Sequence, residues 1–142
     1  MQNNSQSVKE VEEAIKTWSE ALYNKDLEAM HKDYADEYRI FDVSETVDSV
    51  QGLKDLWKQC LDYFDKPKAE YKDMKIQATD NMAVAHFKSR ISGMTAPVPE
   101  EMANSWLRGT VCFQKENGIW KCIHEHISFP VDCETNRIAF DK

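Results

Sequence analysis

A chain of 142 residues with 42% hydrophobic and 11% aromatic residues is large enough to bury the core of one domain. Its 18 Lys and Arg against 25 Asp and Glu leave a net charge of −7. No stretch concentrates basic residues for phosphate binding, which argues against nucleic acid as a partner. The first residues lack the basic and apolar run of a signal peptide, and no segment is long enough to cross a membrane. We therefore expect a cytoplasmic protein, with no membrane partner, whose four cysteines are free thiols.

Three amphipathic helices are expected in the first half of the chain. The first begins at Ser7 and Glu10, which match a capping box, the pairing in which a hydroxyl and a carboxylate satisfy free backbone N–H groups at a helix start. It ends before Asp26, which is expected to cap a second, shorter helix. The third helix covers residues 50–64, and Pro67 is expected to end it.

Strands dominate the rest of the predicted structure. The aromatic and branched residues of segment 38–43 predict a strand between the second and third helices. Beyond residue 69 the apolar residues alternate, which predicts four further strands at residues 69–78, 82–91, 104–115 and 120–131. Residues 93–101 contain two prolines and are expected to form a loop over the mouth of a cavity. Helices followed by an antiparallel meander predict an α+β fold.

The last predicted strand carries a carboxylate among apolar residues. Alternation places Glu125 on one face with Ile123 and Ile127, while His124 and His126 lie on the other face. An unpaired carboxylate is costly to bury in a core. Either this face is not a core, or Glu125 projects into a cavity that has a use for it.

The loop of the final hairpin decides which faces of its two strands coincide. A two-residue Asn-Gly loop would place Val111 and Phe113 on the same face as His124. A three-residue Glu-Asn-Gly loop would instead place them beside Glu125. We prefer the three-residue loop because it collects the apolar residues on one face, and Glu125 is then predicted to point inward.

Two segments of the chain, EALYNKDLEAMHKDYADEYRIFDV and NGIWKCIHEHISFPVD, resemble the SnoaL-like branch of the nuclear transport factor 2-like superfamily. Ketosteroid isomerase and the association domain of calcium/calmodulin-dependent kinase belong to the same superfamily. The resemblance extends over residues 7–132. It is most specific at residues 26–42, at Gly52 and in the G-x-W-x-x-x-H-x-H-x-S run of residues 118–128.

The resemblance implies a cone-shaped α+β fold of the cystatin-like type. A curved antiparallel sheet would wrap around a long N-terminal helix, with two further helices and a hydrophobic pocket between sheet and helices. A single domain would span residues 1–142, with its core at about 7–132 and a C-terminal tail at 133–142. Domains of this superfamily commonly pair through the outer face of the sheet, so a homodimer is expected.

The resemblance also indicates where a catalytic group would lie. The position of the ketosteroid isomerase base falls on Asp42. Trp18 occupies the position of one oxyanion donor, and Val111 falls on or beside the other. Loss of such donors costs orders of magnitude in rate, so steroid isomerisation by the familiar arrangement is not expected. Tyr38 alternates with Asp42 along the strand and is a candidate replacement donor.

Asp42 and Glu125 are the candidate catalytic carboxylates. Two carboxylates in one apolar cavity perturb each other, so that one is protonated as the acid and the other is ionised as the base. The alternative is that Asp42 caps a turn and that Glu125 pairs with Lys88, Arg90 or Arg108. The expected pocket lining, which would also suit a plain core, is Trp18, Ile40, Trp57, Phe87, Val111, Phe113, Ile123 and Ile127.

The expected function is a cofactor-independent isomerase, cyclase or hydratase that acts on an apolar carbonyl compound, with Asp42 as base and Glu125 or Tyr38 as proton donor. The alternative is a protein that binds a small hydrophobic ligand without chemistry, or a dimeric assembly domain similar to the kinase association domain. The fold by itself cannot choose between these functions. His124 and His126 share a face and could ligate a metal with a third ligand, but hydrogen-bonded histidines are the preferred interpretation, so no metal is expected.

Overall fold

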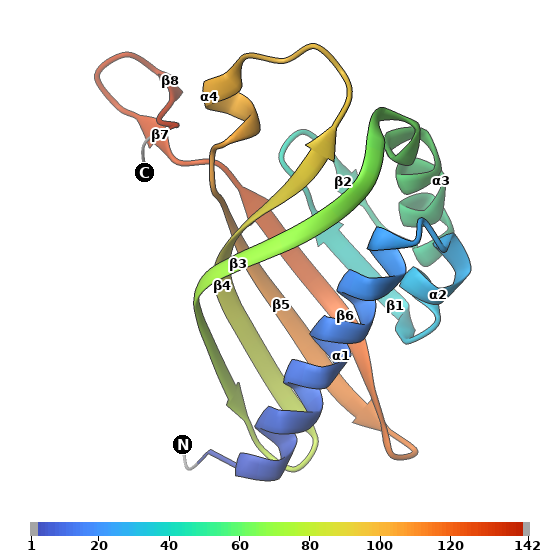
Figure 1. Cartoon of the computed structure of the whole chain (residues 1–142). Coiled ribbons are helices and arrows are strands. Elements are labelled where there is room, and N and C mark those ends of the chain that lie inside the picture. Colours follow the sequence, from blue (N-terminus) through green and yellow to red (C-terminus); the bar gives the residue numbers. More distant parts are fainter. Residues whose placement is uncertain (1–2, 141–142) are drawn as a thin grey trace.

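A curved, mostly antiparallel sheet forms the largest part of the computed structural model, which describes residues 3–140, and the long helix α1 lies against one face of it (Figure 1). The helices are α1 (Ser5–Tyr23), α2 (Leu27–His31), α3 (Val50–Cys60) and the one-turn α4 (Glu100–Ala103), with a 3-10 turn at Leu61–Tyr63. The main strands are β1 (Tyr34–Phe41), β3 (Phe64–Ala78), β4 (Met82–Met94), β5 (Leu107–Glu116) and β6 (Ile119–Ser128). The short strands are β2 (Thr46–Val47), β7 (Val131–Asp132) and β8 (Arg137–Ile138).

The order of the six strands in the main sheet is β2-β1-β6-β5-β4-β3. The β1–β6 pair is parallel and the other pairs are antiparallel. The helices α2 and α3 cover the β1 end of the sheet, and β7 with β8 forms a separate hairpin near the C-terminus (Figure 1). This arrangement confirms the predicted α+β fold with a sheet curved around the N-terminal helix. Within residues 3–140, no helix combines the length and the apolar character needed to cross a membrane.

The start of α1 differs from the predicted capping box. Asn4 is the N-cap, because its side-chain oxygen accepts the backbone N–H of Ser7 at 3.0 Å. Ser7 is therefore already inside the helix. Glu10 accepts hydrogen bonds from Trp120 Nε1 at 2.9 Å and from Lys115 Nζ at 3.0 Å. The carboxylate that seemed to cap the helix instead ties α1 to the tip of the β5–β6 hairpin.

The other helix ends follow from local chemistry. Asp26 caps α2 as predicted, because its Oδ1 accepts the backbone N–H of Ala29 at 3.1 Å. The third helix stops at Cys60, before the predicted end, and Pro67 lies inside β3 instead of ending the helix. Regular β3–β4 pairing resumes at Lys68 after an irregular stretch, so the missing N–H of Pro67 costs no ladder hydrogen bond.

The loop predicted at residues 93–101 is shorter in the structure. Strand β4 continues to Met94, and α4 begins at Glu100. Gly93 has a φ of +91°, and a Cβ at this position would lie 2.4 Å from the backbone oxygen of Asp65. Glycine is required here because β3 approaches the backbone too closely for any side chain.

The tip of the final hairpin corrects the predicted loop. Asn117 and Gly118 both have positive φ and form a two-residue turn, so the three-residue loop predicted from the sequence is wrong. In this lower part of the hairpin Phe113 pairs with Cys122, as a two-residue turn requires.

A β-bulge reverses the register in the upper part of the same hairpin. The pairing shifts between Cys112 and Phe113, and Ile123 is the extra residue on β6. Beyond the shift Val111 pairs with Glu125, so their side chains lie on the same face, as the three-residue loop would also have placed them. The prediction that Glu125 points inward is therefore confirmed, although the bulge is responsible and not the loop.

Two clusters of buried side chains hold the helices to the sheet. In the larger cluster Val11 of α1 and Leu53 of α3 are packed with sheet residues that include Tyr38. In the smaller cluster Leu22 of α1 packs with Met30 of α2. Each such side chain contributes roughly 1.5–3 kcal/mol by leaving water. Residues of both clusters also line a cavity between helices and sheet.

Candidate active site

A cavity of about 720 Å³ lies between the inner face of the sheet and the helices α1, α2 and α3. This volume suits a small organic ligand. The wall is largely apolar and aromatic, and it includes most residues that the sequence predicted as lining: Trp18, Ile40, Trp57, Phe87, Val111, Phe113 and Ile127. Ile123 does not line the cavity, because the β-bulge removes it from the regular inward alternation.

Glu125 brings a carboxyl group into this wall. It lies on β6 between Ile40 of β1 and Val111 of β5, and both of these partners are buried. The hydroxyl of Tyr38 donates a hydrogen bond to Oε2 of Glu125. Burial raises the pKa of Glu125 to about 7; the charge of Asp42 adds to the increase, and the hydrogen bond from Tyr38 opposes it. A carboxyl group with this pKa can both give and take a proton near neutral pH.

Tyr38 lies behind Glu125 and is not part of the cavity wall. Its side chain is 0% exposed, and its ring packs edge to face on Tyr34 with centroids 4.8 Å apart. Burial, and the charge of Glu125 after it, raise the pKa of Tyr38 far above 10, so the hydroxyl remains protonated. The sequence suggested a direct proton donor at Tyr38, whereas the structure places this residue where it holds Glu125.

Asp42 follows the end of β1 and also lines the cavity. Its Oδ1 accepts the backbone N–H of Val43 at 2.8 Å, and its own backbone N–H donates to the carbonyl of Glu45 at 2.8 Å. Asp42 therefore stabilises the turn after β1, which is one of the two alternatives that the sequence left open. Its charge still acts on the pKa of Glu125, so the two carboxyl groups belong to one site.

The basic residues considered as partners of Glu125 do not hold it. Within residues 3–140, no ion pair or hydrogen bond joins Glu125 to Lys88, Arg90 or Arg108. Arg90 is paired with Glu70, with 2.5 Å between Nε and Oε2. The side chain of Glu125 thus has a neutral partner, the Tyr38 hydroxyl, rather than a cation.

Two further polar groups belong to the wall, of which Trp18 was expected as lining and Tyr34 was not. The indole Nε1 of Trp18 is buried and has no hydrogen-bond partner within the part of the chain that the structure describes. Tyr34 lines the cavity, and burial raises its pKa well above 10; the charge of Glu125 adds to this increase and the indole N–H of Trp18 opposes it. Strand β1 begins at Tyr34, whereas the predicted strand began at residue 38. A longer predicted strand would have brought Tyr34 to the sheet beside the site.

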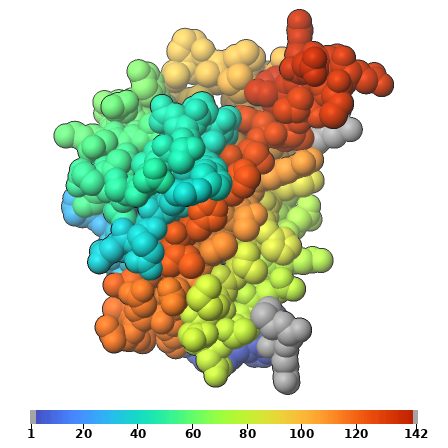
Figure 2. All heavy atoms as spheres, turned by 180° about the vertical axis from the view of Figure 1, so that it is seen from behind, coloured from blue at the N-terminus to red at the C-terminus, as the bar shows by residue number. Residues whose placement is uncertain are grey.

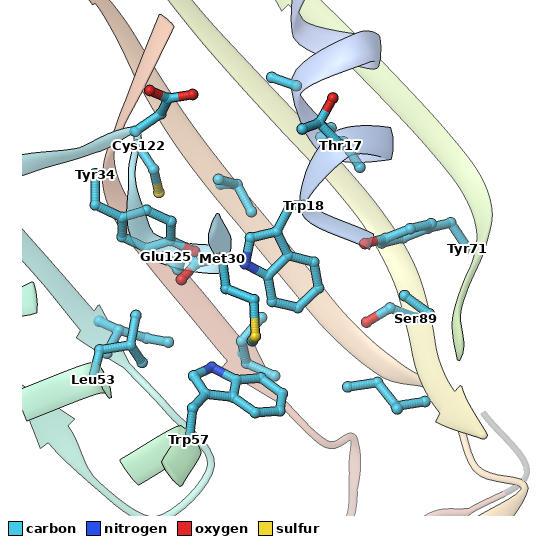
Figure 3. A pocket seen from close by; sticks show the side chains of 18 of the residues that line it. Thr17, Trp18, Met30, Tyr34, Leu53, Trp57, Tyr71, Ser89, Cys122 and Glu125 are labelled. Atoms are coloured by element: carbon cyan, nitrogen blue, oxygen red, sulfur yellow. The ribbon is translucent and has the colours of Figure 1, made fainter. Parts of the chain in front are cut away.

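Figure 3 shows how the polar groups and the aromatic rings converge from separate elements. Trp18 comes from α1, Trp57 from α3, Tyr34 from β1 and Glu125 from β6. The rings of Trp18 and Trp57 meet edge to face, with centroids 5.9 Å apart and planes at 67°. The indole nitrogen of Trp18 points to the side of the cavity where Glu125 lies. The site therefore combines the carboxyl group of Glu125 with two hydrogen-bond donors in an aromatic chamber.

The outer face of the sheet carries the histidines of β6, and Figure 2 shows this side with β1, β6, β5 and β4 exposed. The Nδ1 atom of His124 is hydrogen-bonded to the backbone oxygen of Arg39 at 2.7 Å. The ring of Phe41 packs edge to face on both His124 and His126. No group of three or more His, Cys, Asp or Glu side chains suited to a metal ion occurs among residues 3–140. These contacts favour hydrogen-bonded and packed histidines over metal ligands.

A curved sheet folded over a long N-terminal helix, with a cavity between them, defines the nuclear transport factor 2-like class of domains with a cystatin-like fold. Residues 11–132 match the family model of the SnoaL-like domain. The chain belongs to this family, which confirms the resemblance seen in the sequence.

Solved structures agree with this assignment. An NTF2-like protein of unknown function from Pseudomonas putida KT2440 is 25% identical, with a TM-score of 0.85 over 99% of both chains. A proposed dehydratase of the NTF2-like family from Streptomyces avermitilis is 16% identical, with a TM-score of 0.75 over 90% of this chain and 98% of the other. A protein of unknown function with a cystatin-like fold from Nostoc punctiforme PCC 73102 is also 16% identical, with a TM-score of 0.73 over 90% of this chain and 94% of the other. The latter two similarities show the fold alone. No match was found among curated proteins.

Proposed function

We propose that the cavity is the active site of a cofactor-independent isomerase, cyclase or hydratase that acts on an apolar carbonyl compound. The observation that carries this proposal is the carboxyl group of Glu125, which has a pKa of about 7 inside a largely apolar cavity. A carboxyl group in such surroundings is well matched to proton transfer at neutral pH. The apolar wall would select the substrate and exclude water from the reacting carbon.

In the proposed reaction, ionised Glu125 removes a proton from the carbon beside the substrate carbonyl. The electrons of the C–H bond form the enolate, and the proton stays on Glu125. Return of this proton to a different carbon completes an isomerisation. In a cyclisation, the enolate carbon attacks an electrophilic carbonyl carbon of the same molecule, and Glu125 protonates the resulting alkoxide. Tyr38 would orient Glu125 throughout the reaction. Asp42 would be the second carboxylate, and its negative charge would keep the proton affinity of Glu125 high.

Proton abstraction can be measured without the natural substrate. Apolar ketones with acidic α-protons, beginning with 2-tetralone, would be incubated with the protein in D₂O, and loss of the α-proton signals would be followed by NMR. We expect exchange well above the buffer rate. Glu125→Gln should lower the protein-dependent rate about 10²-fold to 10⁴-fold, the usual contribution of a general acid or base. The matched control is Glu37→Gln, which alters an exposed carboxylate on β1 and should leave the rate unchanged. Equal rates in wild type and Glu125→Gln would contradict the proposal.

Ligand binding without chemistry is the second candidate function. It is favoured by Asp42, whose carboxylate already serves a turn and is therefore less free to act as a second catalytic group. This function predicts that ketones bind in the cavity, with saturable changes in tryptophan fluorescence, while their α-protons exchange no faster than in buffer. The exchange experiment and a fluorescence titration on the same sample separate the two functions.

We also propose a homodimer that forms through the outer face of the sheet. Phe41, His124 and His126 form a packed cluster of rings on this face, which would give a second copy apolar and polar contacts together. An assembly domain similar to the kinase association domain would use the same surface. Pairing there would leave the cavity on the opposite face of the sheet open to a ligand.

A further inference from the structure

The indole N–H of Trp18 is the polar group of the cavity that remains unexplained. It is buried and has no hydrogen-bond partner within residues 3–140. An indole N–H can only donate, and a buried donor without an acceptor is costly, so native structures rarely keep one without a reason. Trp57 packs edge to face on the same ring and helps to fix its orientation.

A second donor lies beside this N–H. Tyr34 lines the cavity, and its hydroxyl is near the indole N–H of Trp18. The Trp18 N–H opposes the rise in the pKa of the Tyr34 hydroxyl, as a donor near the phenol oxygen does, although the two groups do not reach hydrogen-bond geometry. Burial nevertheless keeps the pKa of Tyr34 well above 10, so this hydroxyl carries a proton to donate. In Figure 3 the indole nitrogen of Trp18 points to the side of the chamber where Tyr34 and Glu125 lie.

We infer that Trp18 and Tyr34 form an oxygen-binding subsite, which holds the acceptor oxygen of a neutral, largely apolar ligand next to Glu125. This inference rests on the proposed function, because it names the part of the cavity that would hold the carbonyl oxygen while Glu125 acts on the neighbouring carbon. Donation by both groups would also stabilise negative charge as it develops on that oxygen.

The same groups disfavour other classes of ligand. A hydrocarbon would fill the aromatic chamber but would leave the N–H of Trp18 without an acceptor. A carboxylate ligand would lie against Glu125 and Asp42, and the guanidinium of Arg90 on the wall is already paired with Glu70. An ammonium group could pair with Glu125, but its own N–H donors would face the indole N–H of Trp18 and the hydroxyl of Tyr34, which need an acceptor. A ketone or similar neutral acceptor satisfies all of these groups.

Three naphthalenes of nearly the same shape can test the inference. They are 2-acetylnaphthalene, 2-ethylnaphthalene and 1-(2-naphthyl)ethylamine, which present a ketone, a hydrocarbon and an amine. Dissociation constants would be measured by titration of wild-type protein at pH 7. We expect the ketone to bind about fivefold to tenfold more tightly than the hydrocarbon, as one buried neutral hydrogen bond would give. Binding of the ketone should also move the indole ¹H signal of Trp18 downfield in ¹⁵N-labelled protein.

Variants show whether the preference comes from this subsite. Trp18→Phe and Tyr34→Phe, which removes only the hydroxyl, should each reduce the ketone preference while the hydrocarbon binds almost as before. Trp57→Phe is the matched control, because it shortens the other ring of the same pair and should weaken ketone and hydrocarbon together. The inference is overturned if the ketone has no advantage over the hydrocarbon, if the amine binds best, or if the preference survives in both Trp18→Phe and Tyr34→Phe.

The outcome is independent of catalysis. Ketone preference that depends on Trp18, without exchange of α-protons, would support the subsite and reject the acid/base enzyme. Exchange that requires Glu125, without any ketone preference, would support the enzyme and reject the subsite.

Discussion

Neighbouring residues of β6 occupy two very different surroundings. Glu125 faces a largely apolar cavity, where burial raises its pKa to about 7. His124 and His126 lie on the outer face, where Phe41 packs against their rings. The polar residues of this strand therefore do not form one continuous site. The inner carboxyl group is suited to chemistry on a ligand, and the outer imidazoles are suited to contact with another surface.

The first way to test this difference is the pH dependence of stability. Glu125 has a pKa of about 7 in the folded protein against an ordinary value of 4.5, so the folded state holds its proton more tightly than the unfolded state. Its contribution to the free energy of unfolding is therefore complete below pH 4.5 and is lost as the pH rises through 7. The loss is about 3 kcal/mol at most. Glu125→Gln, which stays neutral, should gain stability relative to wild type over this interval in urea unfolding.

The outer face supplies the control for this measurement. His126→Gln changes the residue that follows Glu125 on β6 and lies exposed on the outer face, and it should shift the free energy of unfolding by no more than about 0.5 kcal/mol. All three proteins would be compared at one concentration, because association alters apparent stability. If the free energy of unfolding depended on pH in the same way in wild type and Glu125→Gln, Glu125 would be solvated. The contrast between the two faces of β6 would then disappear.

A smaller effect is expected from the residue behind the carboxyl group. The hydroxyl of Tyr38 stabilises the ionised form of Glu125, so Tyr38→Phe should raise the pKa of Glu125 further, by about 1. The measurement is a ¹³C NMR titration of the carboxyl carbon, assigned with Glu125→Gln. Tyr71→Phe is a suitable control, since it removes a hydroxyl from the same cavity wall whose partner is Ser19 at 3.1 Å. An unchanged or lowered pKa in Tyr38→Phe would show that this hydrogen bond does not hold the carboxylate.

Most of the fold follows from the sequence because it depends on repeated patterns. Helical spacing of apolar residues and their later alternation were sufficient for the α+β order of elements. Single contacts were less predictable. The carboxylate of Glu10 has the spacing of a capping box, but Trp120 and Lys115, more than a hundred residues away, bind it instead. Such competition between local and distant partners leaves no local signal.

In the site, too, the features that follow from a repeated sequence pattern were predictable and the single contacts were not. Glu125 was expected to face inward because its strand neighbours are apolar, and this inference survives although the assumed loop was wrong. A compensating bulge at Ile123 returns Glu125 to the inner face, and strict alternation cannot reveal a bulge. Tyr34 was missed because β1 begins at this residue, whereas the strand was predicted from the aromatic and branched residues of segment 38–43. The unpartnered N–H of Trp18 depends on the packing of α1 against α3, which no spacing rule describes.

A substitution on the outer face should have the smallest effect on the fold and the cavity. It therefore tests most directly the proposal that the two faces of β6 have separate roles. We expect wild-type protein to sediment as a dimer of 16.5 kDa chains at tens of micromolar in analytical ultracentrifugation. Phe41→Glu places a charge in the centre of the ring cluster and should shift the sedimentation to a monomer, because a buried unpaired carboxylate opposes association. Tyr23→Glu, at an exposed site on α1, should leave the dimer intact. If wild type is already a monomer, the outer face has no role in pairing. If Phe41→Glu also changes the pKa of Glu125, the two faces of β6 are coupled and the division does not hold.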